Sequence, residues 1–242
     1  MVQNHLLQVL ALVAMDPPAD ASAGDTQDKK AEVFRAMPPA DPQYYVRGQY
    51  EEYADVPGAA PDSTTETYVA LRLEIDNWRW ADVPVFLRVG KALPHKVTEV
   101  RLFLRREPRL AFLSLPTRAD PNQIVLRIDP DPGLRLQLSA LAEQSWRPVH
   151  LDTSFARELG EPPEPYERLL HAAIVGHHQL FAREDSVEET WRIVQPLLDH
   201  PPDVRPYPRG SLAARGGGSP GPRPPALAAA VAAHGELSPT DR

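Results

Sequence analysis

The sequence has 242 residues, of which 42% are hydrophobic and 24% are charged, so it is long enough to fold as one ordinary soluble domain with a sizeable core. Its formal net charge of -7 gives no general attraction for nucleic acid or anionic lipid, and any anion site must come from a local concentration of Lys and Arg. It contains no Cys, which excludes disulfides, thiol catalysis and thiolate metal sites and fits a reducing, cytoplasmic location.

The sequence begins with a mostly apolar segment from Leu6 to Met15. This segment is shorter than the roughly 18 residues that a membrane span needs. No Lys or Arg precedes it and Asp16 follows it, so we expect neither a membrane span nor a signal peptide. Its apolar residues surround almost the whole helical wheel, which predicts a helix over residues 2–15 that needs cover on most sides.

Proline and glycine mark the boundaries of the next segments. Pro17 and Pro18 end the first helix, and a polar loop of small residues is predicted as far as Asp28. A short amphipathic helix is predicted over residues 31–37. A loop rich in Pro and Gly is then predicted over residues 48–61, and it leads into the first strand.

Alternation of apolar and polar residues predicts several strands in the middle of the sequence. Residues 65–76 alternate cleanly, which is typical of a strand buried on one face only. Four further segments continue the strand signal, at 83–89, 99–105, 123–128 and 134–138. The later segments follow one another too closely for helical crossovers, so we expect a sheet of at least five strands with largely antiparallel pairing.

Two helices and a tail complete the sequence. The helices are predicted over residues 166–182 and 187–198, the second opened by Asp185 and Ser186. The fold class is therefore α+β, with a large, mostly antiparallel sheet and flanking helices. Residues 212–242 are rich in Pro, Gly and Ala and lack a core pattern, so we expect one domain over residues 1–211 and a disordered tail.

Two segments carry residues suited to a reactive or binding site. His5 is a polar position on the apolar first helix, where a histidine is more often a hydrogen-bonded core residue than a general base. The densest basic stretch contains Arg88, Lys91 and Lys96. Gly90 ends a strand there and would let the backbone approach a ligand, for which phosphate is the natural fit. The alternative is a solvated loop with ordinary surface lysines.

Other chemical motifs are missing. His171, His177 and His178 have no Asp, Glu or Cys at ligand spacing, so no metal site is predicted. The sequence has no GxGxxG, GxxxxGK[ST] or GxSxG motif, and so shows no dinucleotide cradle, P-loop or nucleophile elbow. Any cofactor must be bound largely by something else.

Five blocks of sequence carry a family likeness. They are QNHLLQ at 3–8, DSTTET at 62–67, NWRWADVPVFLRVGKAL at 77–93, YERLL at 166–170 and WRIVQPLL at 191–198. In this order and at this spacing they resemble glucose-6-phosphate dehydrogenase. One block alone would be weak, but five ordered blocks over residues 1–211 are improbable by chance.

The resemblance implies a role for each candidate residue. His5 matches the family's general base, which takes the proton of the sugar C1 hydroxyl as hydride leaves for NADP. Lys91 and Lys96 match contacts to the substrate, glucose 6-phosphate. Arg88 and Arg101 match positions that help to hold a second, structural NADP in some members. Val97 replaces a basic residue of that second site, so the structural cofactor is not expected here.

The family also places an N-terminal Rossmann domain before this one, and no block of this sequence matches it. We therefore expect the substrate-binding and subunit-pairing domain of an NADP-dependent oxidoreductase of the pentose phosphate pathway, inactive as an isolated chain. We expect a homo-oligomer, or pairing with a dehydrogenase subunit. The alternative is a non-catalytic interaction domain that pairs with full-length subunits.

Overall fold

The structure is a computed structural model in which residues 1–20, 22–105, 121–142, 145–160 and 163–211 are described. These residues form two compact units. The first unit comprises Met1–Pro94 and the described residues from Leu169 onward, and the second comprises His95–Arg168. The tail predicted to be disordered, residues 212–242, lies outside the described residues.

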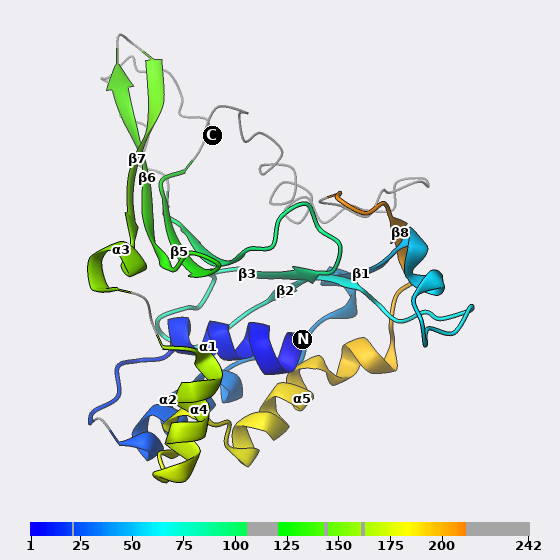
Figure 1. The fold of residues 1–242 in the computed structure, drawn as a ribbon, viewed down its shortest axis with the longest axis horizontal. Coiled ribbons are helices and arrows are strands. Elements are labelled where there is room, and N and C mark those ends of the chain that lie inside the picture. The colour runs from blue at the N-terminus through cyan, green and yellow to red at the C-terminus, as the bar shows by residue number, and fades with distance from the viewer. Residues whose placement is uncertain (21, 106–120, 143–144, 161–162, 212–242) are drawn as a thin grey trace. The chain divides into compact units, whose positions relative to one another are not determined.

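A four-stranded sheet in the order β3-β2-β1-β8 forms the centre of the first unit (Figure 1). Its strands are β1 (Tyr45–Tyr50), β2 (Tyr68–Leu73), β3 (Val85–Gly90) and β8 (Arg205–Tyr207). The pairs are antiparallel except that β8 runs parallel to β1. Strand β2 is buried along almost its whole length, not on one face as predicted, because apolar clusters lie on both of its faces.

Helices cover one face of this sheet (Figure 1). The predicted first helix is confirmed as π-helical turns, η1 (Val2–Leu7), that continue into α1 (Gln8–Ala14). The helices α2 (Ala23–Arg35) and α5 (Glu184–Asp199) pack beside it around a common apolar core. This core supplies the cover that the apolar first helix requires.

Two predicted loops before β2 are wrong over part of their length. The polar loop expected as far as Asp28 contains the first turn of α2, which starts early because the Ser22 hydroxyl accepts a hydrogen bond from the Asp25 N–H at 3.1 Å. The loop expected over residues 48–61 contains the end of β1 and the short helix η3 (Glu51–Asp55). Another short helix, η2 (Pro42–Tyr44), precedes β1.

The helix predicted over residues 166–182 is interrupted. Helix α4 (Pro165–Ile174) ends two residues before Gly176, whose φ of 74° is the left-handed conformation that commonly terminates helices. A short helix, η4 (His178–Leu180), follows. The last predicted helix is confirmed as α5, which begins slightly earlier, at Glu184. No helix among the described residues is long and apolar enough to cross a membrane.

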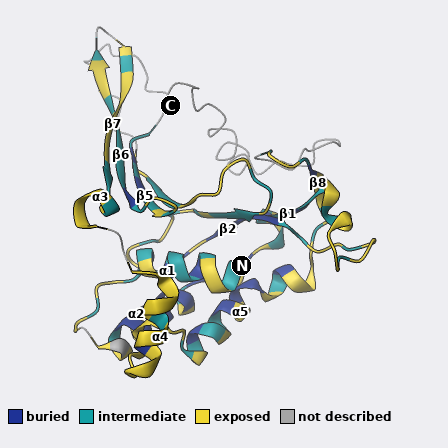
Figure 2. Cartoon of the chain, in the orientation of Figure 1, coloured by how far each residue is buried: buried dark blue, intermediate teal, exposed yellow. Residues whose placement is uncertain are grey.

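The second unit is an antiparallel sheet in the order β4-β5-β6-β7. Its strands are β4 (Thr98–Phe103), β5 (Gln123–Asp129), β6 (Gly133–Ala142) and β7 (Ser145–Ser154), and the helix α3 (Phe155–Leu159) follows. The α+β class and the mostly antiparallel pairing are thus confirmed. Within the described residues, however, the strands divide between two four-stranded sheets instead of forming one larger sheet. Figure 2 shows the outer part of the β6–β7 hairpin as largely exposed.

Candidate functional site

His5 lies in the π-helical turns of η1 and is exposed. Such turns are rare in proteins and occur frequently at functional sites. Within the described part of the chain, its imidazole has no hydrogen-bond or ion-pair partner. The structure therefore disfavours the interpretation of His5 as a hydrogen-bonded core residue and leaves the imidazole accessible to a ligand.

Lys91 directly follows β3 and extends its pairing with β2 by one residue. The Lys91 N–H donates to the Thr67 carbonyl at 2.8 Å, one step beyond the pairing of Gly90 with Tyr68. Because side chains alternate along a strand, Lys91 belongs to the same sheet face as Val89 and not to that of Gly90. Its side chain is exposed, and among the described residues it has no partner.

The face to which Lys91 belongs is the one that the helices cover. Val89 packs against the helical core together with Val2 of η1, and η1 contacts β3. His5 on η1 and Lys91 at the end of β3 therefore flank the same junction of the first unit. The family resemblance implies proton transfer for the first of these residues and substrate binding for the second.

Arg88 does not join this pair. It is opposite Ala70 in the sheet, on the face that carries the aromatic cluster of Tyr68 and Tyr207. Burial raises the pKa of Tyr68 above its ordinary value, and the positive charge of Arg88 opposes this rise in part. Arg88 of β3 and Lys91 directly after β3 thus belong to opposite faces of the sheet.

Gly90 serves internal packing, while the close approach of a ligand that the sequence suggested stays a prediction. A Cβ at this position would lie 2.9 Å from Cδ2 of Tyr68 and 3.1 Å from Cδ1 of Leu93. Both atoms belong to the aromatic face of the sheet. A side chain here would therefore displace the turn that carries Lys91.

We expect Gly90→Ala to lower the free energy of unfolding by about 1–3 kcal/mol, the usual cost of overpacking a filled site. Urea unfolding followed by circular dichroism measures the change. Gly24→Ala in α2 is the matched control, because nothing lies within 4 Å of its added Cβ and Ala favours a helix. Equal unfolding free energies for Gly90→Ala and wild type would contradict this packing role.

Trp80 fixes the far end of the helix that carries His5. Its indole Nε1–H donates to the Ala14 carbonyl at 2.9 Å, at the last residue of α1. The turn before it is closed by Asn77, whose Oδ1 accepts from the Trp80 N–H at 2.9 Å. An ion pair of 3.1 Å between Arg79 and Asp16 adds a surface contact. The NWRW block therefore holds the first helix against the sheet.

Sequence reasoning missed two residues behind Lys91. Tyr207 of β8 is only 1% exposed, and its hydroxyl donates to the Lys91 carbonyl at 2.8 Å. The Thr67 hydroxyl lies 3.0 Å from the same tyrosine oxygen. Burial raises the pKa of Tyr207 above its ordinary value, so the hydroxyl keeps its proton and donates at neutral pH. The only available signal was that Thr67 lies in the DSTTET block and that the likeness extends over residues 1–211.

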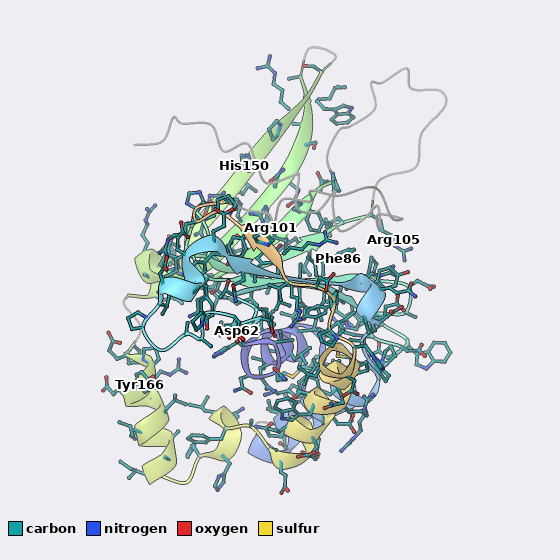
Figure 3. All side chains as sticks on the ribbon, turned by 90° about the vertical axis from the view of Figure 1, so that its right-hand side faces the viewer. Asp62, Phe86, Arg101, Arg105, His150 and Tyr166 are labelled. Carbon is teal, nitrogen blue, oxygen red and sulfur yellow. The ribbon has the colours of Figure 1, made fainter. Side chains whose placement is uncertain are left out.

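Lys96 and Arg101 belong to the second unit. The Lys96 side chain is 91% exposed and lies 3.6 Å from Asp129, an ion pair weak enough for a ligand to displace. Arg101 projects from β4, as His150 does from β7 (Figure 3), and its Nε donates to Glu99 at 2.6 Å. Arg101 thus has an internal carboxylate partner, while Val97 beside Lys96 is 53% exposed.

The two faces of the second sheet differ in chemistry. The register places Arg101, Val125, Arg135 and Asp152 in one row, and the next row, Leu102, Ile124, Leu136 and Leu151, points to the opposite face. That opposite face is apolar along all four strands, and none of its members is buried. We call it the apolar face; it consists of Val100, Leu102, Ile124, Leu126, Leu134, Leu136, Leu138, Val149 and Leu151.

A cavity in the first unit involves none of the candidate residues. It has a volume of about 440 Å³ and is lined by Tyr45, Val46, Pro201, Pro202, Asp203 and Arg205. His5 and Lys91 are instead exposed on the surface. In the part of the chain that is described, no group of three or more His, Asp or Glu residues is placed to hold a metal ion.

Comparison with known proteins agrees with the resemblance found in the sequence. A family model described as glucose-6-phosphate dehydrogenase, C-terminal domain, matches residues 1–217. Glucose-6-phosphate 1-dehydrogenase 1 of Mycobacterium tuberculosis is 70% identical over 210 residues, which cover 87% of this chain and 45% of that protein. The glucose-6-phosphate 1-dehydrogenase of Mycolicibacterium smegmatis is 36% identical over 237 residues, covering 87% of this chain and 47% of that protein.

Two solved structures share the fold. The crystal structure of glucose-6-phosphate 1-dehydrogenase from Mycobacterium avium has a TM-score of 0.80 and 67% identity, covering 87% of this chain and 46% of that chain. A glucose-6-phosphate dehydrogenase in complex with its substrate glucose-6-phosphate has a TM-score of 0.79 and 30% identity, covering 98% of this chain and 50% of that one. The chain therefore spans about half the length of the relatives it matches.

Proposed function

This chain belongs to the glucose-6-phosphate dehydrogenase C-terminal domain family, and we propose from this premise that it binds glucose 6-phosphate within an NADP-dependent dehydrogenase. The reaction oxidises glucose 6-phosphate to 6-phosphogluconolactone, in the pentose phosphate pathway. The observation that carries the proposal is that His5 and Lys91, both exposed, flank the junction of η1 and β3.

The proposed roles follow from the chemistry of the side chains. Lys91 holds the sugar phosphate by charge-assisted hydrogen bonds, which are stronger than neutral ones, and the family resemblance gives Lys96 a role in substrate contact as well. His5 accepts the proton of the C1 hydroxyl as C1 is oxidised, a task suited to an imidazole near neutral pH. Holding the sugar against the base is the main contribution of the lysines, since orientation lowers the barrier.

NADP, when bound, supplies the acceptor for the hydride that leaves C1. The residues of this chain do not fit a dinucleotide site, because the sequence has no Gly-rich turn of the Rossmann type. The coenzyme is therefore assigned to the portion of the relatives that this chain does not span. A second, structural NADP is not proposed, since Arg101 is paired with Glu99 and Val97 offers no charge.

Isothermal titration of the full chain with glucose 6-phosphate tests the proposal. We expect binding that Lys91→Ala weakens about 10- to 100-fold, because a hydrogen bond to a charged group is lost. Lys29→Ala is the matched control, since Lys29 is bound to Glu32 on α2. A folded wild-type chain that binds no glucose 6-phosphate, or equal binding by the Lys91→Ala chain, would contradict the assignment of a substrate half-site.

The apolar face of the second sheet supports a role in subunit pairing as well. Soluble proteins seldom leave a contiguous apolar surface of this kind uncovered unless it is an interaction site. We propose that the face pairs with the same face of a second copy, as expected for isologous homo-oligomers. In the alternative function, the chain is a non-catalytic module that uses the same face to join full-length dehydrogenase subunits.

A further inference from the structure

We infer that Tyr207 is a positioning residue that fixes the backbone of Lys91, and hence the place from which its ammonium group reaches the substrate phosphate. The inference rests on the proposed function of Lys91. Tyr207 lies 116 positions after Lys91 in the sequence and belongs to the short strand β8.

The ring of Tyr207 is built into the sheet. It packs edge to face against Tyr50 and Tyr68, with centroids 6.3 and 5.7 Å apart. Room for it is made at Gly48, where an added Cβ would lie 3.1 Å from Cδ1 of Tyr207. The parallel pairing of β8 with β1 sets the height of the ring along the sheet. Its hydroxyl therefore has a fixed position.

The hydrogen bonds around this hydroxyl have one consistent direction. The Tyr50 N–H donates to the Thr67 hydroxyl at 3.0 Å, and because the single Tyr207 proton is taken by a carbonyl, the Thr67 hydroxyl donates to the Tyr207 oxygen. The Tyr207 proton then goes to the Lys91 carbonyl at 2.8 Å, which is closer than the Thr67 carbonyl at 3.2 Å. Donors and acceptors balance along this chain of bonds.

Lys91 is thus held at both of its backbone groups. Its N–H is bound by the Thr67 carbonyl at 2.8 Å, and its carbonyl by Tyr207. The next residue, Ala92, has a φ of 50°, a left-handed conformation that a residue with a side chain adopts at some cost. The Ala92 carbonyl accepts from the Gly210 N–H at 2.8 Å. The segment after β8 therefore holds a turn that would otherwise relax.

The test uses Tyr207→Phe in the full chain, which keeps the ring and removes the hydroxyl. Tyr68→Phe is the matched control, because Tyr68 is equally buried in the same cluster and its hydroxyl has no bond within the described residues. Hydrogen exchange resolved by NMR is measured at the Lys91 and Gly210 amides. We expect exchange there to become about 3- to 10-fold faster in Tyr207→Phe only, with the amides of β1 unchanged.

Titration with glucose 6-phosphate is the second readout. We expect Tyr207→Phe to bind about 3- to 10-fold more weakly than wild type and Tyr68→Phe to bind equally. Unchanged exchange at the two amides would overturn the inference. Faster exchange that spreads to β1 would indicate general loosening and would also overturn the inference. The same holds if Tyr207→Phe leaves the affinity for glucose 6-phosphate unchanged while Lys91→Ala lowers it. If Tyr207→Phe fails to fold, Thr67→Val removes the hydroxyl that donates to the Tyr207 oxygen and is expected to shift both readouts in the same direction. The Tyr50 amide, which bonds to that hydroxyl, is then left out of the β1 comparison.

The positioning role of Tyr207 and the binding of glucose 6-phosphate are tested by separate measurements. Exchange at the Lys91 and Gly210 amides is measured without ligand, so it reports on positioning whether or not the chain binds sugar phosphate. Failure of the proposed function would appear instead as equal binding by the wild-type and Lys91→Ala chains.

Discussion

Replacing His5 with Asn is expected to lower kcat about 100- to 10,000-fold in an enzyme reconstituted from this chain and the portion of the 70% identical relative that this chain does not span. In the proposed reaction the C1 hydroxyl loses its proton as C1 is oxidised, and the amide of Asn cannot accept that proton. The KM for glucose 6-phosphate is expected to change far less, since the lysines hold the phosphate. The rate of NADPH formation, measured by absorbance, gives both constants.

A histidine elsewhere on the surface provides the control for this experiment. His171 lies on α4 and is exposed, so His171→Asn is expected to leave kcat unchanged. Binding of glucose 6-phosphate to the isolated His5→Asn chain shows whether the variant still folds and holds the substrate. Wild-type kcat in the reconstituted His5→Asn enzyme would remove His5 from the role of general base.

The local pattern of apolar residues was sufficient to predict the first helix and β3, the elements that position His5 and Lys91. The first helix is apolar on nearly every side, and this signal holds for a short segment whatever surrounds it. The alternation of Val85, Leu87 and Val89 identifies the covered face of β3. Continued by one step, the same alternation assigns Lys91 to the helix side, although that step needs the hydrogen bond to Thr67 to confirm that the strand pairing reaches it.

Contacts between residues far apart in the sequence could not be predicted from local patterns. Strand β8 has three residues, includes Pro206 and pairs with residues 157 positions earlier, such as Gly48 with Arg205, so no local periodicity predicts it. The sequence therefore predicts no strand or helix at Tyr207. The packing role of Gly90 was missed for the same reason, because the atoms that fill the space above it come from Tyr68 and from the turn after β3. Tertiary packing, not spacing, decides both.

A carboxylate in the middle of the apolar face is expected to break the proposed pairing of subunits. Leu136 is opposite Ile124 on one side and Leu151 on the other, so Leu136→Glu places a charge among apolar side chains. Burying an unpaired charge costs several kcal/mol, and each 1.4 kcal/mol is a factor of ten. We expect self-association to weaken at least about 100-fold, as measured by sedimentation equilibrium of the full chain.

The neighbouring residue gives a control on the same strand. Gln137 points to the opposite, polar face, where it is paired with Gln123 and His150, so Gln137→Glu adds the same charge without entering the apolar face. Weaker association in Leu136→Glu alone identifies the apolar face as the contact. Equal weakening in both variants would indicate a general effect of charge, and a wild-type chain that stays monomeric at high concentration would contradict pairing of this face with its own copy. Association that appears only when a full-length dehydrogenase is added would favour the non-catalytic alternative, because the same surface would then serve a different subunit.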